Sequence, residues 1–245
     1  MNLPCTRVPA LMSFLFLTIL LTGCNADRDI RDYYFPAREL TTGLVYAYEN
    51  IGTLPGPEID YTYYLGVDVD TALYLSVTQY SQFLEPKQQS RQEIKNDGVY
   101  LREITLLRPD TSGPSLPMPT TLIHDRAFPF YLSDEATEAY GYRLSFTDPD
   151  RPQTLTYVTM NRRFERDTTI EVLGKNYPGL LFSLEGEVSL RDTEEGDISP
   201  QFTGYEIYAK GLGLVEHKRE LGSGASLGGR LQERLTMEDF LERVR

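Results

Sequence analysis

A two-residue alternation of apolar and other side chains constrains the fold of this 245-residue chain more than any other feature. The alternating rows occupy residues 61–69, 73–77, 140–146, 155–157 and 180–188. Turn-forming sequences such as Asn96-Asp97-Gly98 and Asn176-Tyr177-Pro178-Gly179 separate the rows. This period and these breaks indicate many short strands. The chain has 17 Tyr and no Trp, which suits strands whose half-buried faces carry amphipathic rings.

The C-terminal segment favours a helix. Thr236 is placed to cap its N-terminus through Asp239 three residues later, after a Gly- and Ser-rich stretch at residues 222–229. The apolar residues at helical spacing are Met237, Phe240, Leu241 and Val244. A helix with such a face needs an apolar surface, which either the sheet of this chain or a partner protein supplies.

The N-terminal segment has the pattern of an export signal. One positive charge, Arg7, precedes an apolar run from Val8 to Leu21, which is shorter than the roughly 20 residues that span a bilayer. The run ends in Leu21-Thr22-Gly23-Cys24. This order resembles the lipobox of bacterial lipoproteins, in which Leu21, Thr22 and Gly23 form the cleavage motif and Cys24 receives acyl chains such as palmitate. The alternative is ordinary signal cleavage, which yields a secreted protein without acyl chains.

Cys24 is the one cysteine left after such a cleavage, because Cys5 leaves with the signal peptide. The exported domain can then form no internal disulfide and no thiol-ligated zinc site. Asn25 follows the cysteine, where an Asp marks inner-membrane retention in enteric bacteria, so we predict the outer membrane. A net charge of −12 argues against nucleic acid and polybasic membrane binding. The acyl chains on Cys24 must therefore hold the protein on its membrane.

These features together predict an all-β fold, a single antiparallel, strongly curved sheet or barrel with a short C-terminal helix. The predicted segments are a signal peptide at residues 1–23, a lipidated polar tether at 24–34, the β domain at 35–221, a Gly/Ser linker at 222–229 and an amphipathic helix at 230–245.

Residues with possible chemistry do not form a recognisable site. His124 and His217 have no further ligand at metal-binding spacing, so we predict no metal and no cofactor. Residues 224–228 match the G-x-S-x-G pattern of hydrolases, but no histidine follows Ser226, which argues against catalysis. Acidic clusters at residues 68–70 and 192–197 do not fit a calcium loop.

Two segments, one near each end of the predicted β domain, combine aromatic residues and glycines in distinctive motifs. The opening motif, residues 35–48, contains Phe35-Pro36, Leu40, Gly43, Tyr46 and Tyr48. The closing motif, residues 208–216, reads Tyr-Ala-Lys-Gly-Leu-Gly-Leu-Val-Glu. Together the two motifs resemble those of a group of exported, often lipid-anchored β-proteins common in Bacteroidetes. The resemblance implies a β-fold and an envelope location. From the residues themselves, we expect Pro36 at the entry to an edge strand and Gly211 and Gly213 in a turn between two strands.

A curved sheet that closes on itself can enclose an apolar interior. We therefore predict a non-catalytic envelope lipoprotein that binds an apolar or amphipathic ligand, in outline like periplasmic lipid carriers. The alternative is a scaffold or accessory subunit of an envelope protein complex, which the membrane anchor and the C-terminal helix favour. An enzyme is the least favoured class.

Overall fold

The computed structural model describes residues 27–244, except residues 82, 110–114, 133–138, 193 and 195. The elements are, in chain order, β1 (Arg28–Asp29), the 3-10 helix η2 (Arg31–Tyr33), β2 (Leu44–Asn50), β3 (Ile59–Val69), β4 (Ala72–Tyr80), β5 (Pro86–Ile94), β6 (Gly98–Arg108), β7 (Leu116–Pro119), β8 (Thr121–His124), β9 (Arg126–Pro129), β10 (Tyr131–Leu132), β11 (Tyr140–Thr147), β12 (Thr154–Val172), β13 (Lys175–Asp192), β14 (Gln201–Ala209), β15 (Gly213–Glu220), β16 (Ser226–Leu235) and α1 (Met237–Arg243).

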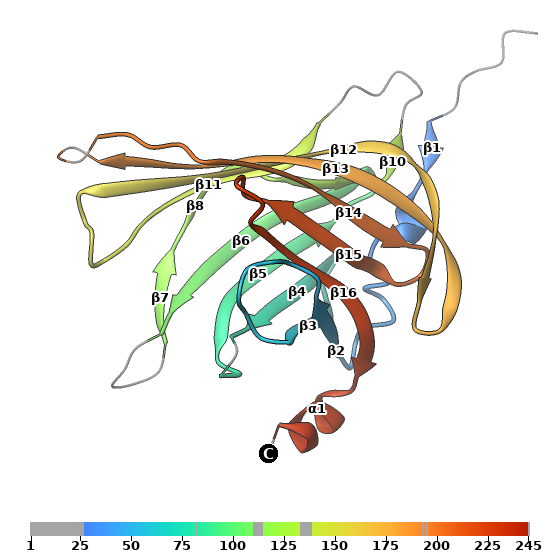
Figure 1. Cartoon of the computed structure of the whole chain (residues 1–245). Helices are drawn as coiled ribbons and strands as arrows, with labels where there is room; N and C mark the ends of the chain where they lie inside the picture. Colours follow the sequence, from blue (N-terminus) through green and yellow to red (C-terminus); the bar gives the residue numbers. More distant parts are fainter. Residues whose placement is uncertain are drawn as a thin grey trace, which may run out of the picture.

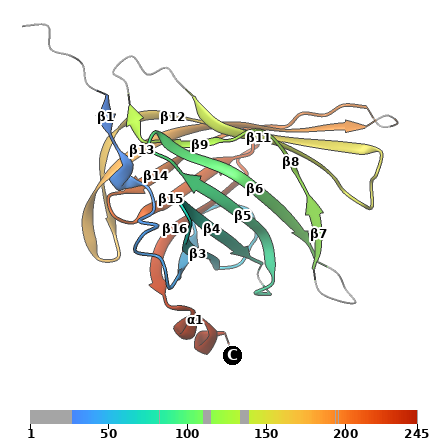
Figure 2. The same cartoon turned by 180° about the vertical axis from the view of Figure 1, so that it is seen from behind.

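Fourteen strands form one antiparallel sheet that curls into a nearly closed barrel (Figures 1 and 2). Its order is β7-β6-β5-β4-β3-β2-β16-β15-β14-β13-β12-β11-β8, and β9 pairs with β6. The barrel closes where Leu101 and Ile104 of β6 pack with Leu144 of β11. The predicted fold class, a curved antiparallel sheet or barrel with a short C-terminal helix, is confirmed.

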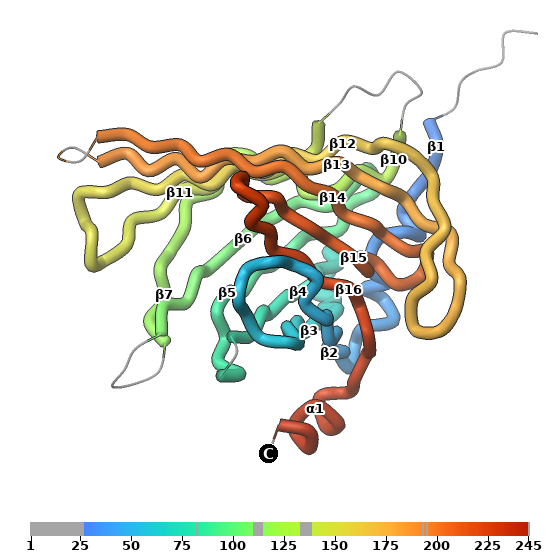
Figure 3. Tube along the Cα trace, viewed as in Figure 1, coloured from blue at the N-terminus to red at the C-terminus, as the bar shows by residue number. Residues whose placement is uncertain are grey.

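The longest strands, β12 and β13, have 19 and 18 residues and pair along their whole length. In Figure 3 their joining hairpin curls over one end of the barrel, while their other ends project beyond it. Val172 in this hairpin is buried in the main apolar cluster. The hairpin therefore covers the barrel end where the N-terminal segment lies.

Residues 30–43 form what we call the N-terminal plug, which lies across that end of the barrel (Figure 1). Ile30 is fully buried and its amide donates to the carbonyl of Phe130, while the amide of Gly211 donates to the carbonyl of Asp32. The prediction of a solvated tether through residue 34 is therefore wrong from Arg28 onward, since β1 pairs with β10. The many charges of this segment hid the few apolar side chains that anchor it.

The opening and closing motifs meet at the plug. A Cβ atom on Gly213 would lie 2.5 Å from the ring of Phe35, and the Tyr46 hydroxyl donates to the carbonyl of Leu212 at 3.0 Å. Gly211 and Gly213 have φ of +76° and +86° in the turn between β14 and β15, as predicted. Pro36, however, enters no edge strand: it belongs to the plug, and β2 lies inside the sheet between β3 and β16.

The Gly-rich stretch is not a flexible linker. Strand β16 begins at Ser226, and a Cβ atom on Gly228 would lie 2.7 Å from the carbonyl oxygen of His217 on β15. Glycine is present here because the neighbouring backbone is close. The predicted helix from residue 230 is accordingly too long, since β16 continues to Leu235 before α1 starts.

Helix α1 packs against the outside of its own barrel. Thr236 accepts a hydrogen bond from the amide of Asp239 at 3.1 Å, so the predicted cap is confirmed. Phe240 is buried, with its ring centroid 5.0 Å from that of Tyr61 and 5.6 Å from that of Tyr80. Leu241 is 44% exposed and does not belong to the packed face. No helix in the described residues is long and apolar enough to cross a membrane.

Candidate functional site

The barrel interior is apolar next to the plug. Phe128 and Phe182 are fully buried there, and their ring centroids lie 4.8 Å and 5.7 Å from that of Tyr208. Tyr208 points its hydroxyl away from this cluster and donates to Oε2 of Glu206 at 2.8 Å. Tyr208 therefore joins the apolar layer to a polar layer deeper in the lumen.

A buried ion pair forms the centre of the polar layer. Nε of Arg162 on β12 lies 3.0 Å from Oε2 of Glu206 on β14, and both side chains are about 95% buried. Burial alone would raise the pKa of Glu206, but the charges of Arg162 and Arg219 and the Tyr208 hydroxyl hold it below its usual range. Burial alone would lower the pKa of Arg162, but the Glu206 carboxylate raises it above its usual value. Both groups are therefore ionised at neutral pH.

Strand β15 contributes a second guanidinium to the lumen. Arg219 pairs in register with Gly204, and His217 pairs with Glu206, so both face inward with the ion pair. Nη2 of Arg219 lies 3.7 Å from the sulfur of Met160, and its Cζ lies 5.8 Å from the ring centre of Phe202. Nε of Arg219 is buried and has no hydrogen-bond partner.

These groups line what we call the lumen cavity, a space of about 190 Å³. Its lining residues are Tyr34, Phe35, Tyr64, Val77, Gln79, Gln88, Ser90, Gln92, Leu101, Ile104, Ala127, Tyr142, Met160, Arg162, Glu206, Tyr208, Leu214 and Arg219. The lining thus combines rings and aliphatic side chains with amides, hydroxyls and three charged groups. Such a mixture suits a ligand with an apolar body and a polar group.

The lowered pKa of His217 makes part of the free energy of unfolding depend on pH. Burial, aided by the Arg219 charge, lowers this pKa from 6.5 to about 4. The unfolded chain therefore gains a proton that the folded chain resists, and stability is lost as the pH falls from 6.5 towards 4. We expect H217Q to reduce the stability loss between pH 7.5 and 5 by about 1–2 kcal/mol, measured by urea unfolding.

The matched control is His124, the other histidine, whose side chain is exposed on β8. H124Q should leave the pH dependence unchanged. An equal effect of the two variants would contradict the assignment to His217.

A second space, of about 510 Å³, opens outside the plug. It is larger than the lumen cavity, and its basic lining residues are Arg31, Arg38, Lys95 and Lys210. Each of them has a nearby carboxylate, such as Asp32, whose Oδ2 lies 3.3 Å from Nζ of Lys210. These exposed ion pairs contribute little to stability, and each of the four basic side chains has a carboxylate partner. We therefore take the lumen cavity as the candidate site.

The residues singled out in the sequence do not meet in this site. Cys24, Leu21, Thr22 and Gly23 lie outside the described residues. Ser226 is buried in β16, and its hydroxyl lies 3.4 Å from Oγ1 of Thr53. Within the described part of the chain, no three His, Cys, Asp or Glu side chains are grouped to hold a metal ion.

The charged residues of the lumen were not predicted from the sequence. A signal was present, because Glu206 alternates with Phe202, Gly204 and Tyr208 and must share their inward face. A carboxylate on a row that also carries a buried aromatic ring needs a partner charge. The alternation could not reveal which strand supplies Arg162, because that depends on strand register.

The fold and the site define a class: a barrel-like antiparallel β-protein with a plugged end and a small, charged lumen. No protein-family model and no curated protein sequence matches the chain. A solved structure from Parabacteroides distasonis, of a protein proposed to be a lipoprotein, has a TM-score of 0.52 and 12% identity, covering 84% of this chain and all of that one. This likeness supports the fold.

Two further solved structures are less similar. A protein from Bacteroides fragilis, proposed to be exported and described as having a YmcC-like fold, has a TM-score of 0.48 and 12% identity over 82% of this chain and 98% of its own. The hypothetical lipoprotein YmcC from Escherichia coli has a TM-score of 0.31 and 10% identity over 94% of this chain and 99% of its own.

Proposed function

We propose that this chain is an envelope lipoprotein whose barrel binds a small amphipathic molecule without transforming it. The observation that carries the proposal is the lumen cavity, where Leu101 and Ile104 face a space that is also lined by Arg162, Glu206 and Arg219. An apolar lining gains packing contacts from an apolar ligand, and buried charged groups need polar partners. A ligand with an apolar body and a polar group can meet both requirements.

The volume limits the size of the ligand. Sites for drug-sized molecules measure about 300–1,000 Å³, whereas an apolar cavity of about 150 Å³ is enough for benzene. The lumen cavity, at about 190 Å³, is therefore matched to one ring or a short chain. A lipid with two long acyl chains does not fit, which narrows the expected ligand to a small molecule.

The polar groups of the lumen favour binding over catalysis. Glu206 is held by Arg162 and Tyr208, so its carboxylate has a lowered pKa and is a poor general base. The hydroxyls of Tyr34 and Tyr64 have raised pKa values because they are buried, and they are neutral hydrogen-bonding groups at physiological pH. This arrangement is suited to orienting a bound molecule.

The anchor belongs to the same proposal. It is supported by the lipobox-like sequence ending at Cys24 and by the structural neighbour from P. distasonis that is proposed to be a lipoprotein. Asp27 is three positions after Cys24, and an extended chain covers at most about 10 Å over three positions. Acyl chains on Cys24 would hold the barrel against its membrane, and Asn25 favours the outer membrane.

The scaffold alternative has lost part of its support. Besides the membrane anchor, it was favoured by the C-terminal helix, and Phe240 of this helix packs against Tyr61 and Tyr80 of the same barrel. This helix therefore does not need a partner protein to cover that side chain.

Ligand binding can be tested by filling the cavity. Ser90 lines it and pairs with Val77, whose neighbour Ser76 faces the outside of β4. We expect native mass spectrometry of the full chain, purified from envelopes in detergent, to show a bound small molecule in the wild type and in S76L but not in S90L. Equal loads in all three forms, or no load in any of them, would contradict the proposal.

Anchoring can be tested with the two cysteines of the chain. We expect C24S to lose palmitate labelling and to leave the membrane fraction, whereas C5S, altered within the predicted signal peptide, should keep both. Sucrose-gradient separation of the membranes tests the outer-membrane assignment. A C24S protein that remains labelled would overturn the lipidation site.

A further inference from the structure

The lumen cavity has an unbalanced charge. Three charged side chains line it: the guanidinium groups of Arg162 and Arg219 and the carboxylate of Glu206. Glu206 contacts Arg162 at 3.0 Å, so one positive charge in the lining has no carboxylate of its own. Asp60 of β3, whose charge acts on His217, is paired with Lys87 at 3.1 Å. The excess is notable in a chain with a net charge of −12.

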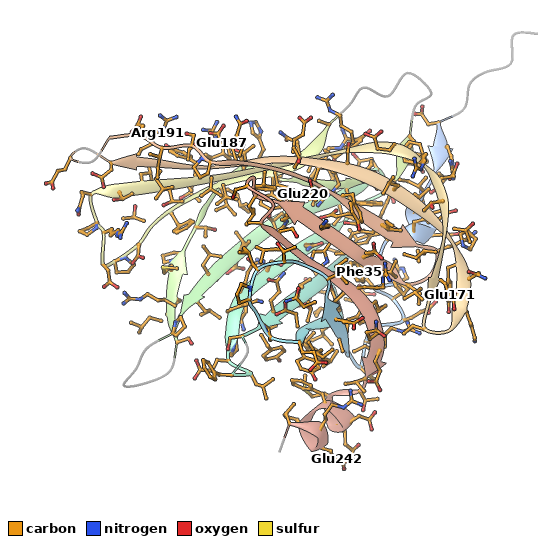
Figure 4. The ribbon with its side chains drawn as sticks, viewed as in Figure 1. Phe35, Glu171, Glu187, Arg191, Glu220 and Glu242 are labelled. Carbon is orange, nitrogen blue, oxygen red and sulfur yellow. The ribbon has the colours of Figure 1, made fainter. Side chains whose placement is uncertain are left out.

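Arg219 is the group that carries this excess. Its neighbours are the sulfur of Met160 and the ring of Phe202, which attract a guanidinium weakly and do not neutralise it. Its buried Nε lacks a hydrogen-bond partner, and an unmade hydrogen bond from a charged donor is unfavourable. Strand β15 begins at Gly213, beside Phe35 of the plug, and ends at Glu220, which Figure 4 labels. Arg219 precedes Glu220 and therefore lies near the barrel end opposite the plug.

We propose that the ligand of this cavity is a small organic monocarboxylic acid, bound through its carboxylate to Arg219, with its apolar part beside Leu101, Ile104 and Leu214. This inference rests on the proposed function and adds the chemical class of the ligand. A carboxylate matches the fork of a guanidinium and supplies the one missing negative charge. A phosphate ester would bring nearly two charges and leave the site negatively charged.

The inference can be tested with two pairs of probes of equal shape: benzoate with benzamide, and hexanoate with hexanamide. Isothermal titration of the full chain at neutral pH should give at least one carboxylate that binds tenfold or more tightly than its amide. R219Q should abolish that preference, while R219K, which keeps the charge, should retain part of it.

Arg143 provides the matched control. Its Cζ lies 4.9 Å from the ring centre of Tyr157 and its Nε is buried without a partner, as for Arg219, but it faces the outside of β11. R143Q should leave the carboxylate preference unchanged. Thermal unfolding of each variant shows whether it is folded under the conditions of the titration.

The outcomes separate the two proposals. If acids and amides bind equally in the wild type, or if R219Q keeps the preference, the assignment of a carboxylate to Arg219 is wrong while the binding function stands. If none of the four probes binds and the purified protein carries no small molecule, both proposals fail.

Discussion

Replacing Glu206 with glutamine should lower the free energy of unfolding by about 3–5 kcal/mol, because the change leaves the Arg162 charge buried without its counter-charge. Glutamine keeps the shape and one acceptor oxygen, so the loss reports the charge and not a cavity. Urea unfolding followed by far-UV circular dichroism measures it. A double variant, R162M with E206L, should be more stable than E206Q, because no isolated charge then remains in the lumen.

The control for E206Q is E103Q. Glu103 and Arg91 form a cross-strand pair at 3.4 Å, but their side chains are 59% and 56% exposed. Breaking such a solvated pair should change stability by less than about 1 kcal/mol. If E206Q and E103Q have the same effect, the buried pair does not contribute in the way described.

The second large effect is expected at Gly213. G213A should reduce stability by about 3 kcal/mol, because a left-handed backbone is unfavourable with a Cβ atom and because the added methyl meets the Phe35 ring. That ring cannot easily move, since it stacks on Tyr64 with centroids 4.2 Å apart. Denaturant unfolding gives the magnitude, and adding F35L to G213A should recover part of the loss.

Gly211 separates the two causes. Its φ of +76° resembles the +86° of Gly213, but a Cβ atom placed there would have no heavy atom within 4 Å. G211A should therefore show only the backbone contribution, about 1–2 kcal/mol. Equal losses in G211A and G213A would show that the contact between Phe35 and the turn is unimportant.

The strands could be predicted from the sequence because antiparallel strands with one inward face carry the two-residue period. The period does not say which face is inward. On β3 the row containing Tyr61 and Tyr63 faces outward, beneath α1, while Tyr64 points into the lumen. Helix α1 covers this outward row with apolar side chains, so aromatic residues are tolerated on both faces of β3. The sequence of β3 alone does not indicate that a helix covers its outer face.

The two ends of the domain were mispredicted for different reasons. At the N-terminus, one buried side chain, Ile30, fixes a segment whose other residues are mostly charged. In the Gly-rich stretch, composition suggested flexibility where close backbone packing required glycine. The lumen site depends on strand register, which brings Arg162, Glu206 and Arg219 together from three strands. Register is a property of the assembled sheet and cannot be read from one segment.

The pairing of β2 with β16 limits how early in its synthesis the chain can complete its fold. It joins the first long strand of the sheet to the last, and across it Gln232 donates to Glu49, 183 residues earlier in the chain. A chain that is synthesised from its N-terminus therefore presents β2 with one unpaired edge until β16 has been made. Contacts so distant in sequence form slowly, and open edges promote aggregation in the meantime. The plug contacts the turn after β14, so it likewise cannot reach its final position until most of the chain has been synthesised.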